Sequence, residues 1–297
     1  MTLSKNQRLA TRIRARQFFV APGVFDMISA RICDTMGFTA LYMTGYGTVA
    51  SHLGVADAGL ASFRDMVDRA ARIAGGTGTP LIADADTGYG GPLNVRQTVR
   101  GYEAAGVSAM HIEDQVDPKK CGHTPGTRVI PAEDMVTKIK VALDARRDDD
   151  FLIIARTDSR AGEGIDEACR RGEAYIKAGC DVLFVEALRT VAEMETVARR
   201  FDHPLMANIS NGGVTPVTPA ETLAKIGYAF AIYPGVAFNA AAEAIKRASA
   251  ALLRDGDSLK LDVPLMPLEE MHRVMGFPDV WAFEEKWSGA GAASGHA

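Results

Sequence analysis

Eight short apolar runs recur along the chain, and each is followed by a segment long enough for a helix. The runs are almost continuously apolar, which is typical of strands buried on both faces of a parallel sheet. Eight strand and helix units in succession predict an α/β fold, a closed (β/α)₈ barrel, ahead of an open doubly wound sheet. No GxGxxG follows the first run, which weakens a dinucleotide-binding alternative. The runs begin at Phe18, Ala40, Pro80, Ser108, Phe151, Asp181, Pro204 and Ala229.

The repeated units also predict the domain boundaries. They fill the chain to about residue 248, so we expect one barrel over residues 1–248. Residues 249–287 contain no ninth strand but hold several Met, Phe and Trp residues, and we expect a helical segment whose apolar surface needs a partner. The residues alone favour packing on the same barrel over packing on another subunit. Residues 288–297, rich in Gly, Ala and Ser, are predicted to be disordered.

Composition excludes several classes of protein. A net charge of −4 without a long basic run argues against a nucleic-acid partner. The four cysteines have no zinc-ribbon spacing, and a reducing, cytoplasmic setting fits them. No run approaches the length of a membrane span. The Arg-rich start also resembles a mitochondrial transit peptide, although Leu9 and Ile13 give a surface helix an apolar stripe without that role.

Polar residues gather where the predicted strands end. In a (β/α)₈ barrel these positions form the catalytic face. Because buried unpaired carboxylates are costly, acids after several successive strands favour a functional rim over ordinary capping residues. The polar residues that finish the runs include Tyr42, Thr44, Asp84, Asp86, His111, Glu113, Asp114, Arg156, Asp158, Glu186, Asn208 and Ser210.

Three of these acids predict a metal site. Asp84, Asp86 and Glu113 offer hard oxygen ligands, and Asp84 and Asp86 point to the same side if their strand continues that far. Mg²⁺ suits such a set better than zinc, since no His or Cys has ligand spacing here. The alternative is that the acids cap helices or pair with arginines. Arg156 is expected to bind a substrate carboxylate or phosphate, or else to pair with a neighbouring acid.

The segment 117–131 predicts a lid. It follows the fourth strand, is rich in Gly, Pro and Lys, and is longer than an ordinary connection. Cys121 lies in it among Lys119, Lys120 and His123. That basic setting predicts a favoured thiolate that exchanges a proton near neutral pH.

Together these motifs carry a family resemblance. KKCGH at 119–123, ADADTGYGG at 83–91 and IARTDS at 154–159 resemble the isocitrate lyase and phosphoenolpyruvate mutase superfamily. The resemblance is strongest to its branch of methylisocitrate lyase and 2,3-dimethylmalate lyase-like enzymes, and it extends to GFPDVWAFEEKW at 276. It implies a homotetramer, a dimer of dimers that exchange the C-terminal helix, which replaces the expectation of packing on the same barrel.

The resemblance also implies roles for individual residues. Asp84 would meet Mg²⁺, or Mn²⁺, directly, while Asp86, Glu113 and Asp57 would hold its waters. Cys121 would be the acid/base. The other implied catalytic and lid residues are Lys119, Lys120, Gly122, His123, Arg156 and Glu186. The other implied substrate-binding residues are Tyr42, Thr44, Gly45, Tyr46, Asn208 and Ser210.

The implied reaction is cleavage of the C2–C3 bond of a substituted 2-hydroxy dicarboxylate to a 2-keto acid such as pyruvate and a carboxylate. Asn239 stands where methylisocitrate lyases have an Arg, so a tricarboxylate fits poorly. Asn211 stands where dimethylmalate lyases typically have a Glu, which leaves the exact substrate open.

Other functions remain as alternatives. Within the superfamily they are hydrolysis or decarboxylation of oxaloacetate and a phosphonopyruvate-type reaction, although the Cys-bearing lid argues against the latter. Outside it they are a Schiff-base aldolase using Lys119 or Lys120, and a non-catalytic binding protein.

Overall fold

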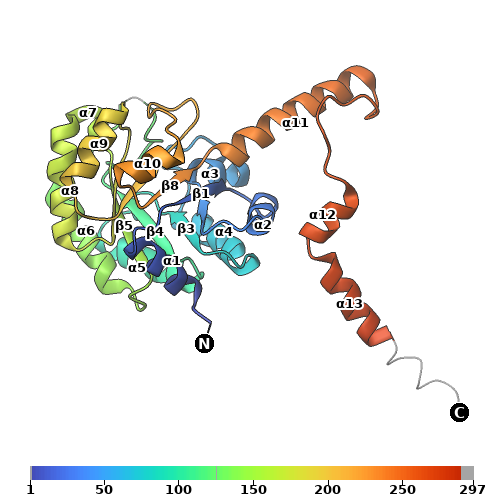
Figure 1. Cartoon of the computed structure of the whole chain (residues 1–297), viewed down its shortest axis with the longest axis horizontal. Coiled ribbons are helices and arrows are strands. Elements are labelled where there is room, and N and C mark those ends of the chain that lie inside the picture. Colours follow the sequence, from blue (N-terminus) through green and yellow to red (C-terminus); the bar gives the residue numbers. More distant parts are fainter. Residues whose placement is uncertain (1, 125, 289–297) are drawn as a thin grey trace, which may run out of the picture. The chain divides into compact units, whose positions relative to one another are not determined.

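The computed structural model describes residues 2–124 and 126–288. Eight parallel strands close into a barrel in sequence order (Figure 1). Each strand coincides with one of the apolar runs in the sequence, so the predicted (β/α)₈ barrel is confirmed. The strands are β1 (Phe19–Val24), β2 (Leu41–Met43), β3 (Leu81–Asp84), β4 (Ala109–Glu113), β5 (Leu152–Thr157), β6 (Val182–Val185), β7 (Leu205–Asn208) and β8 (Phe230–Tyr233).

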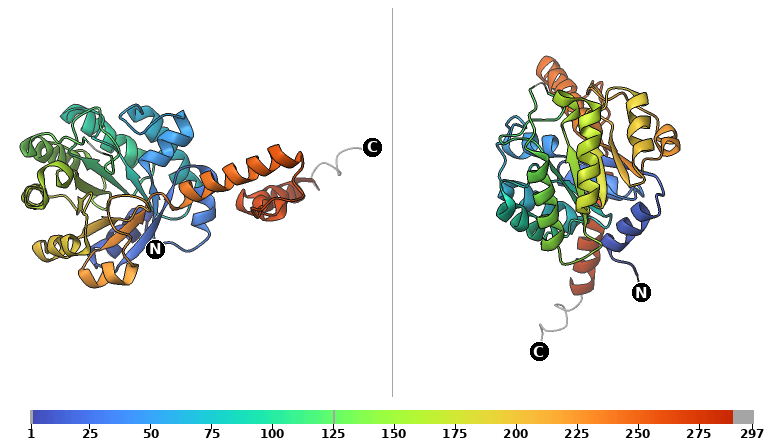
Figure 2. Two further views of the ribbon diagram at one scale, coloured as in Figure 1. Left: turned by 90° about the horizontal axis from the view of Figure 1, so that it is seen from above. Right: turned by 90° about the vertical axis from the view of Figure 1, so that its left-hand side faces the viewer.

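The helices that connect the strands surround the barrel (Figure 2). The first connecting helix begins after Asp26, whose side chain caps it by accepting the backbone N–H of Ser29 at 2.8 Å. The helices up to the last strand are α1 (Lys5–Arg14), α2 (Met27–Asp34), α3 (Gly45–Leu53), α4 (Phe63–Gly76), α5 (Pro92–Ala104), α6 (Ala132–Ala145), α7 (Arg160–Glu163), α8 (Ile165–Ala178), α9 (Val191–Arg200) and α10 (Ala220–Ile226).

The strands separate two apolar layers, because successive side chains point to opposite faces. On β5, Leu152 and Ile154 belong to the cluster inside the barrel, whereas Ile153 and Ala155 belong to the cluster beneath the helices. The interior is filled by large side chains such as Phe184, so the barrel is a packed core.

Helix α1 closes the amino end of the barrel. Leu9, Ala10 and Ile13 belong to the interior cluster, and Leu9 and Ile13 are at most 1% exposed. The apolar stripe predicted for a surface helix is therefore part of the core. The Lys5 ammonium adds a hydrogen bond of 2.7 Å to the backbone oxygen of Ala74 at the end of α4.

The chain divides into two compact units, Met1–Ala240 and Ala241–Ala297. The first holds the barrel, and α11 (Val236–Asp255) begins in it. The second contains the rest of α11, together with α12 (Leu268–Val274) and α13 (Phe277–Ser288). Within this unit the rings of His272 and Phe277 lie 4.5 Å apart, and Arg247 pairs with Asp262 at 2.8 Å.

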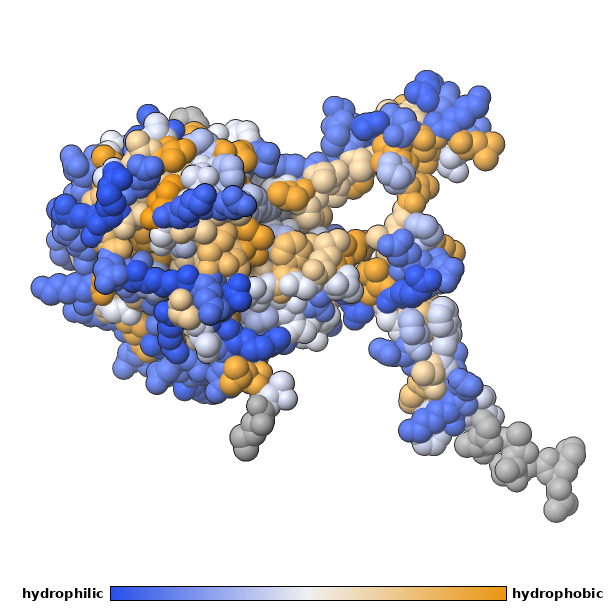
Figure 3. Space-filling model, viewed as in Figure 1, coloured by the Kyte–Doolittle hydropathy of each residue, from blue (hydrophilic) through white to orange (hydrophobic). Residues whose placement is uncertain are grey.

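Large apolar side chains of the second unit are exposed (Figure 3). Trp281 is 49% exposed and Phe283 64% exposed. The predicted exchange of this segment between subunits stays a prediction. Of the predicted disordered tail, Ser288 is the last residue of α13, and residues 289–297 lie outside the described part of the chain. Within residues 2–124 and 126–288 no helix has the length and apolarity needed to cross a bilayer.

Truncating a buried side chain of α1 tests how much this helix stabilises the interior of the barrel. Leu9→Ala should lower the free energy of unfolding by about 3 kcal/mol, because it removes fully buried methyl groups and leaves a cavity. The same change at the 53% exposed Leu3 should alter it by less than about 0.5 kcal/mol. Urea titration followed by circular dichroism measures both values. An equal decrease in the free energy of unfolding in the two variants would contradict the role of α1 in the core.

Candidate active site

The inward-facing positions of the barrel become polar toward the carboxyl ends of the strands. On β4 the inward series runs from Ala109 to His111 and Glu113, and on β5 it runs from Ile154 to Arg156. Strand register places Asp84 beside His111 and Glu113 beside Arg156. The same period of two therefore builds the apolar core below and the polar layer above it.

This polar layer is the floor of a cavity of about 380 Å³. Of the residues to which the resemblance gives a role, two do not line it: Gly45, whose missing side chain leaves room for the Asp84 carboxylate, and Asp86. The others all do. They are Tyr42, Thr44, Tyr46, Asp57, Asp84, Glu113, Lys119, Lys120, Cys121, Gly122, His123, Arg156, Glu186, Asn208 and Ser210.

Asp84, His111 and Glu113 form a candidate metal site. Each offers one ligand atom, and these atoms all lie within 4.8 Å of one another. Glu113 Oε1 and His111 Nδ1 are buried and have no hydrogen-bond partner among the described residues. Burial lowers the pKa of His111 to about 4, so the imidazole is neutral, and burial raises the pKa of Glu113. A buried carboxylate oxygen without a partner fits a hard divalent cation.

Spacing along the sequence missed His111, which lies beside these acids in the group that could hold a metal ion. His111 lies two residues before Glu113 and so on the same face of β4. Its Nε2 is 2.9 Å from the Tyr42 hydroxyl and 3.6 Å from Asp84 Oδ1. The period of two along the strand is the signal that could have found it.

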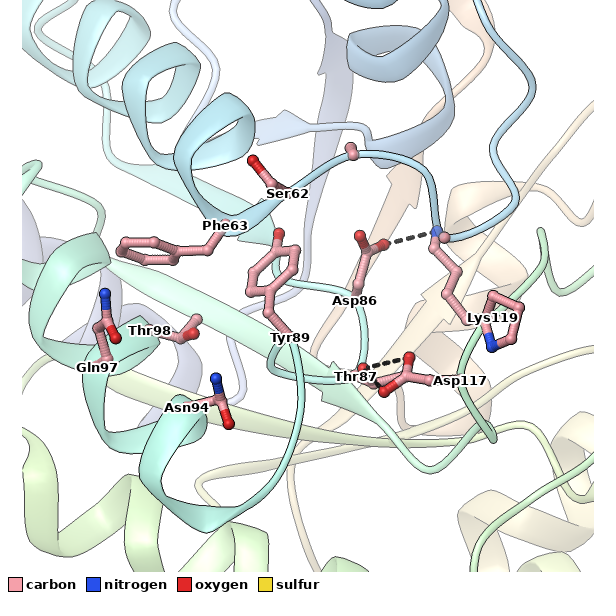
Figure 4. Close-up of a pocket in the computed structure, with 13 residues that line it drawn as sticks. Ser62, Phe63, Asp86, Thr87, Tyr89, Asn94, Gln97, Thr98, Asp117 and Lys119 are labelled. Atoms are coloured by element: carbon pink, nitrogen blue, oxygen red, sulfur yellow. Dashed lines mark hydrogen bonds and ion pairs between the residues drawn. The ribbon is translucent and has the colours of Figure 1, made fainter.

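Asp86 is separated from Asp84 by the end of the strand. β3 ends at Asp84, and Asp86 takes a left-handed conformation with φ of 47°. The strand therefore does not continue far enough to point the side chains of Asp84 and Asp86 to the same side. Lys119 lies 2.6 Å from Asp86 and 2.5 Å from Asp57. Figure 4 shows the Asp86–Lys119 pair from an adjacent cavity of about 520 Å³.

This second set of charges is also buried. Burial opposes the charge on Lys119, but Asp86, Asp84, Glu113 and Asp57 together raise the pKa of its ammonium. Burial raises the pKa of Asp86 to about 7, against the effect of Lys119. The lysine therefore binds two carboxylates of the rim and is itself part of the lid segment.

Arg156 pairs with neighbouring acids, the alternative that the sequence left open. Its Nε and Nη2 donate to the two oxygens of Asp158, each at 2.7 Å. It also lies 3.3 Å from Glu113 and 3.5 Å from Glu186. These pairs fix the guanidinium at the cavity wall, where it keeps a permanent positive charge.

The lid lies directly on this rim. The backbone N–H of Cys121 donates to the backbone oxygen of Asp57 at 3.2 Å. A Cβ atom on Gly122 would lie 2.7 Å from Asp158 Oδ1 and still closer to Arg156 Nη2. On the far side, Asn208 donates to Glu186 at 2.9 Å and lies 3.2 Å from His123 Nε2. The KKCGH segment thus covers the cavity.

The predicted thiolate at Cys121 is wrong. Burial raises the pKa of the Cys121 thiol, and the carboxylates of Asp57 and Glu186 raise it further, against Arg156 and a backbone N–H. Lys119, on which the prediction depended, instead pairs with Asp57 and Asp86. A protonated thiol suits a proton donor better than a nucleophile.

Adding one methyl group should prevent the lid from reaching the rim. Gly122→Ala places Cβ against side chains that are held by hydrogen bonds, so we expect Cys121 to react with iodoacetamide at least roughly tenfold faster than in the parent chain. Gly75→Ala is the matched control, because nothing lies within 4 Å of its added Cβ. Alkylation is measured at the Cys121 peptide by mass spectrometry. An unchanged rate in Gly122→Ala would contradict the close contact.

Comparison with known proteins connects this site to a family. The sequence matches the family model of phosphoenolpyruvate phosphomutase over residues 9–253. It is 41% identical to 2,3-dimethylmalate lyase of Eubacterium barkeri, over 93% of this chain and 96% of that protein.

Solved structures extend the likeness to the whole fold. A structure of 2,3-dimethylmalate lyase superposes with a TM-score of 0.91 at 37% identity and covers all of both chains. Oxaloacetate acetylhydrolase in complex with 3,3-difluorooxalacetate gives a TM-score of 0.90 at 33% identity, over 96% of this chain and 97% of that chain. The resemblance inferred from the motifs is confirmed: the chain belongs to the phosphoenolpyruvate phosphomutase family, within the superfamily of phosphoenolpyruvate mutase and isocitrate lyase.

Proposed function

We propose that the protein is a Mg²⁺-dependent carbon–carbon lyase that cleaves a substituted 2-hydroxy dicarboxylate, with 2,3-dimethylmalate as the best candidate. One observation carries the proposal: the Cys121 thiol, the carboxylates of Asp84 and Glu113 and the Arg156 guanidinium line one cavity beneath the lid, with His111 buried beside the two acids. The 41% identity to a 2,3-dimethylmalate lyase supports the choice of substrate class.

The acids of the rim would hold the metal ion. Asp84 and Glu113 have oxygens suited to Mg²⁺ or Mn²⁺, and Asp86 and Asp57, which both pair with Lys119, would hold its waters. Bound there, the ion would supply positive charge to the oxygens of the substrate. Gly45 serves the site by its small size, since a side chain there would overlap the Asp84 carboxylate.

The protein's own residues supply the remaining chemistry. As the C2–C3 bond breaks, the C2 hydroxyl gives its proton to a carboxylate of the rim and becomes the keto group, and the bonding electrons pass to the C3 fragment as an enediolate. Cys121, protonated because it is buried, gives its proton to C3 and completes the carboxylate product. Arg156 stabilises negative charge on the keto-acid side. The lid excludes water that would compete for the carbanion.

Removing the thiol tests this assignment. Cys121→Ala should lower kcat by about 10²- to 10⁴-fold in a coupled pyruvate assay, because the C3 fragment loses its proton donor. Cys169→Ala, a change at a buried cysteine of α8 away from the cavity, is the control and should retain turnover. Wild-type turnover in Cys121→Ala would refute the role of the thiol.

The same assay distinguishes the metal-dependent lyase from the Schiff-base aldolase. Lyase chemistry at the acid cluster predicts loss of activity in EDTA and no adduct after borohydride treatment with pyruvate. An aldolase using Lys119 or Lys120 predicts the reverse. The two carboxylates beside Lys119 argue against it, since they hold that amine in its charged, non-nucleophilic form.

Asn239 is proposed to limit the number of carboxylates in the substrate. It lines the cavity beyond β8 and carries no charge. Asn239→Arg should therefore lower the Kd of a tricarboxylate such as methylisocitrate by about tenfold, through a new charged hydrogen bond. Asn239→Met is the uncharged control for side-chain length. An unchanged tricarboxylate Kd in Asn239→Arg would show that this position does not set specificity.

A second candidate is hydrolysis of oxaloacetate to oxalate and acetate. It is favoured by the TM-score of 0.90 to oxaloacetate acetylhydrolase. Release of acetate and oxalate instead of a new keto acid distinguishes the two reactions.

We also propose a homotetramer, built as a dimer of dimers that exchange the C-terminal helices, in the reducing environment of the cytoplasm. The exposed Trp281 and Phe283 supply apolar surface for such an interface, and the four cysteines are all free. Trp281→Glu should reduce the mass measured by light scattering below that of four chains, whereas Glu284→Lys on the same helix should not. A tetramer in Trp281→Glu would count against this interface.

A further inference from the structure

Gln115 is a buried polar residue to which the proposed chemistry assigns no role. It follows Asp114 just after β4 and is 2% exposed. Its carboxamide Oε1 accepts the backbone N–H of Lys120 at 3.0 Å, and its Nε2 donates to the backbone oxygen of Lys120 at 2.8 Å. One side chain thus binds both backbone groups of the residue that precedes Cys121.

The backbone of Gln115 belongs to the neck of the lid. Gln115 forms an antiparallel bridge with Val129, and the Val116 N–H donates to the Arg128 oxygen at 2.8 Å. The two ends of the lid are therefore joined at the neck, while the Gln115 side chain reaches the KKCGH segment. Side-chain pairs of Lys119 and the backbone contact of Cys121 also hold this segment, and the carboxamide adds two hydrogen bonds to the backbone of Lys120 between them.

The same carboxamide also contacts the partner of Arg156. Gln115 Nε2 donates to Asp158 Oδ1 at 3.1 Å, and Arg156 Nη2 donates to the same oxygen at 2.7 Å. Gln115, which binds the lid, and Arg156 therefore donate to the same oxygen of Asp158. Loss of the Gln115 carboxamide would therefore remove a donor both from the lid backbone and from the carboxylate that orients Arg156.

We propose that Gln115 is a positioning residue that locks the lid closed and fixes its position relative to Arg156. Neither isosteric nor shorter residues reproduce its contacts. Glutamate would offer only acceptors to Lys120 and Asp158, and asparagine is one methylene too short to span the gap. The lock itself depends only on these contacts, whereas its consequence for catalysis rests on the proposed function.

Hydrogen exchange in the ligand-free protein tests the lock. In Gln115→Met, which keeps the length of the side chain but makes no such hydrogen bonds, amides of the lid peptide over residues 117–124 should exchange about 10- to 30-fold faster. Gln115→Glu, which keeps the shape, should also accelerate exchange, because it loses both donated bonds. Gln17→Met, at an exposed position between α1 and β1, is the control and should leave the lid peptide unchanged.

The outcomes are separable from those of the lyase assay. Lid exchange as slow as in the parent chain in both Gln115 variants would overturn the proposal, and so would equal acceleration across the whole barrel, which would indicate general destabilisation. Acceleration confined to the lid supports the lock even if no hydroxy dicarboxylate is cleaved, in which case only the proposed function fails. With an active lyase, the lock predicts a fall in kcat with an unchanged Kd for Mn²⁺ alone.

Discussion

The structure depends on an imbalance of buried charge at the carboxyl end of the barrel. Two cations, Lys119 and Arg156, are surrounded by six carboxylates. The carboxylates are Asp57, Asp84, Asp86, Glu113, Asp158 and Glu186. Burial of uncompensated negative charge is costly, and the raised pKa values of Asp86 and Glu113 are its direct consequence. A divalent cation among these oxygens would offset the excess, which makes the metal part of the electrostatic balance of the fold.

The barrel tolerates this arrangement because the apolar contacts that stabilise it and the charged residues of the site lie at opposite ends. At the amino end, α1 covers the interior with Leu9 and Ile13. At the carboxyl end, the lid covers the charged rim, and the backbone contact of Cys121 with Asp57 and the close approach of Gly122 to Arg156 exclude solvent. Exclusion of water strengthens each ion pair and also protects a carbanion from premature protonation. One closure therefore serves both the electrostatics and the proposed reaction.

The sequence predicted the parts of this picture that follow from periodicity. Eight apolar runs give eight strands, and the period of two along a strand brings Asp84, Glu113 and Arg156 to one face. It did not predict features that depend on where the lid lies. The basic neighbours of Cys121 favoured a thiolate, but burial and the engagement of Lys119 by two carboxylates keep the thiol protonated. Gln115 has no spacing signal, because its partners Lys120 and Asp158 meet only when the lid is closed.

The central claim is that this rim cleaves a carbon–carbon bond with the help of a divalent cation. The most direct measurement is keto-acid release in a coupled assay over substituted malates, citramalate, methylisocitrate and oxaloacetate, at increasing Mg²⁺. We predict that 2,3-dimethylmalate releases pyruvate with the highest kcat/KM of the panel, at a rate that rises from near zero and saturates with Mg²⁺. Keto-acid release that is independent of divalent cations, or none from any hydroxy acid of the panel, would contradict it.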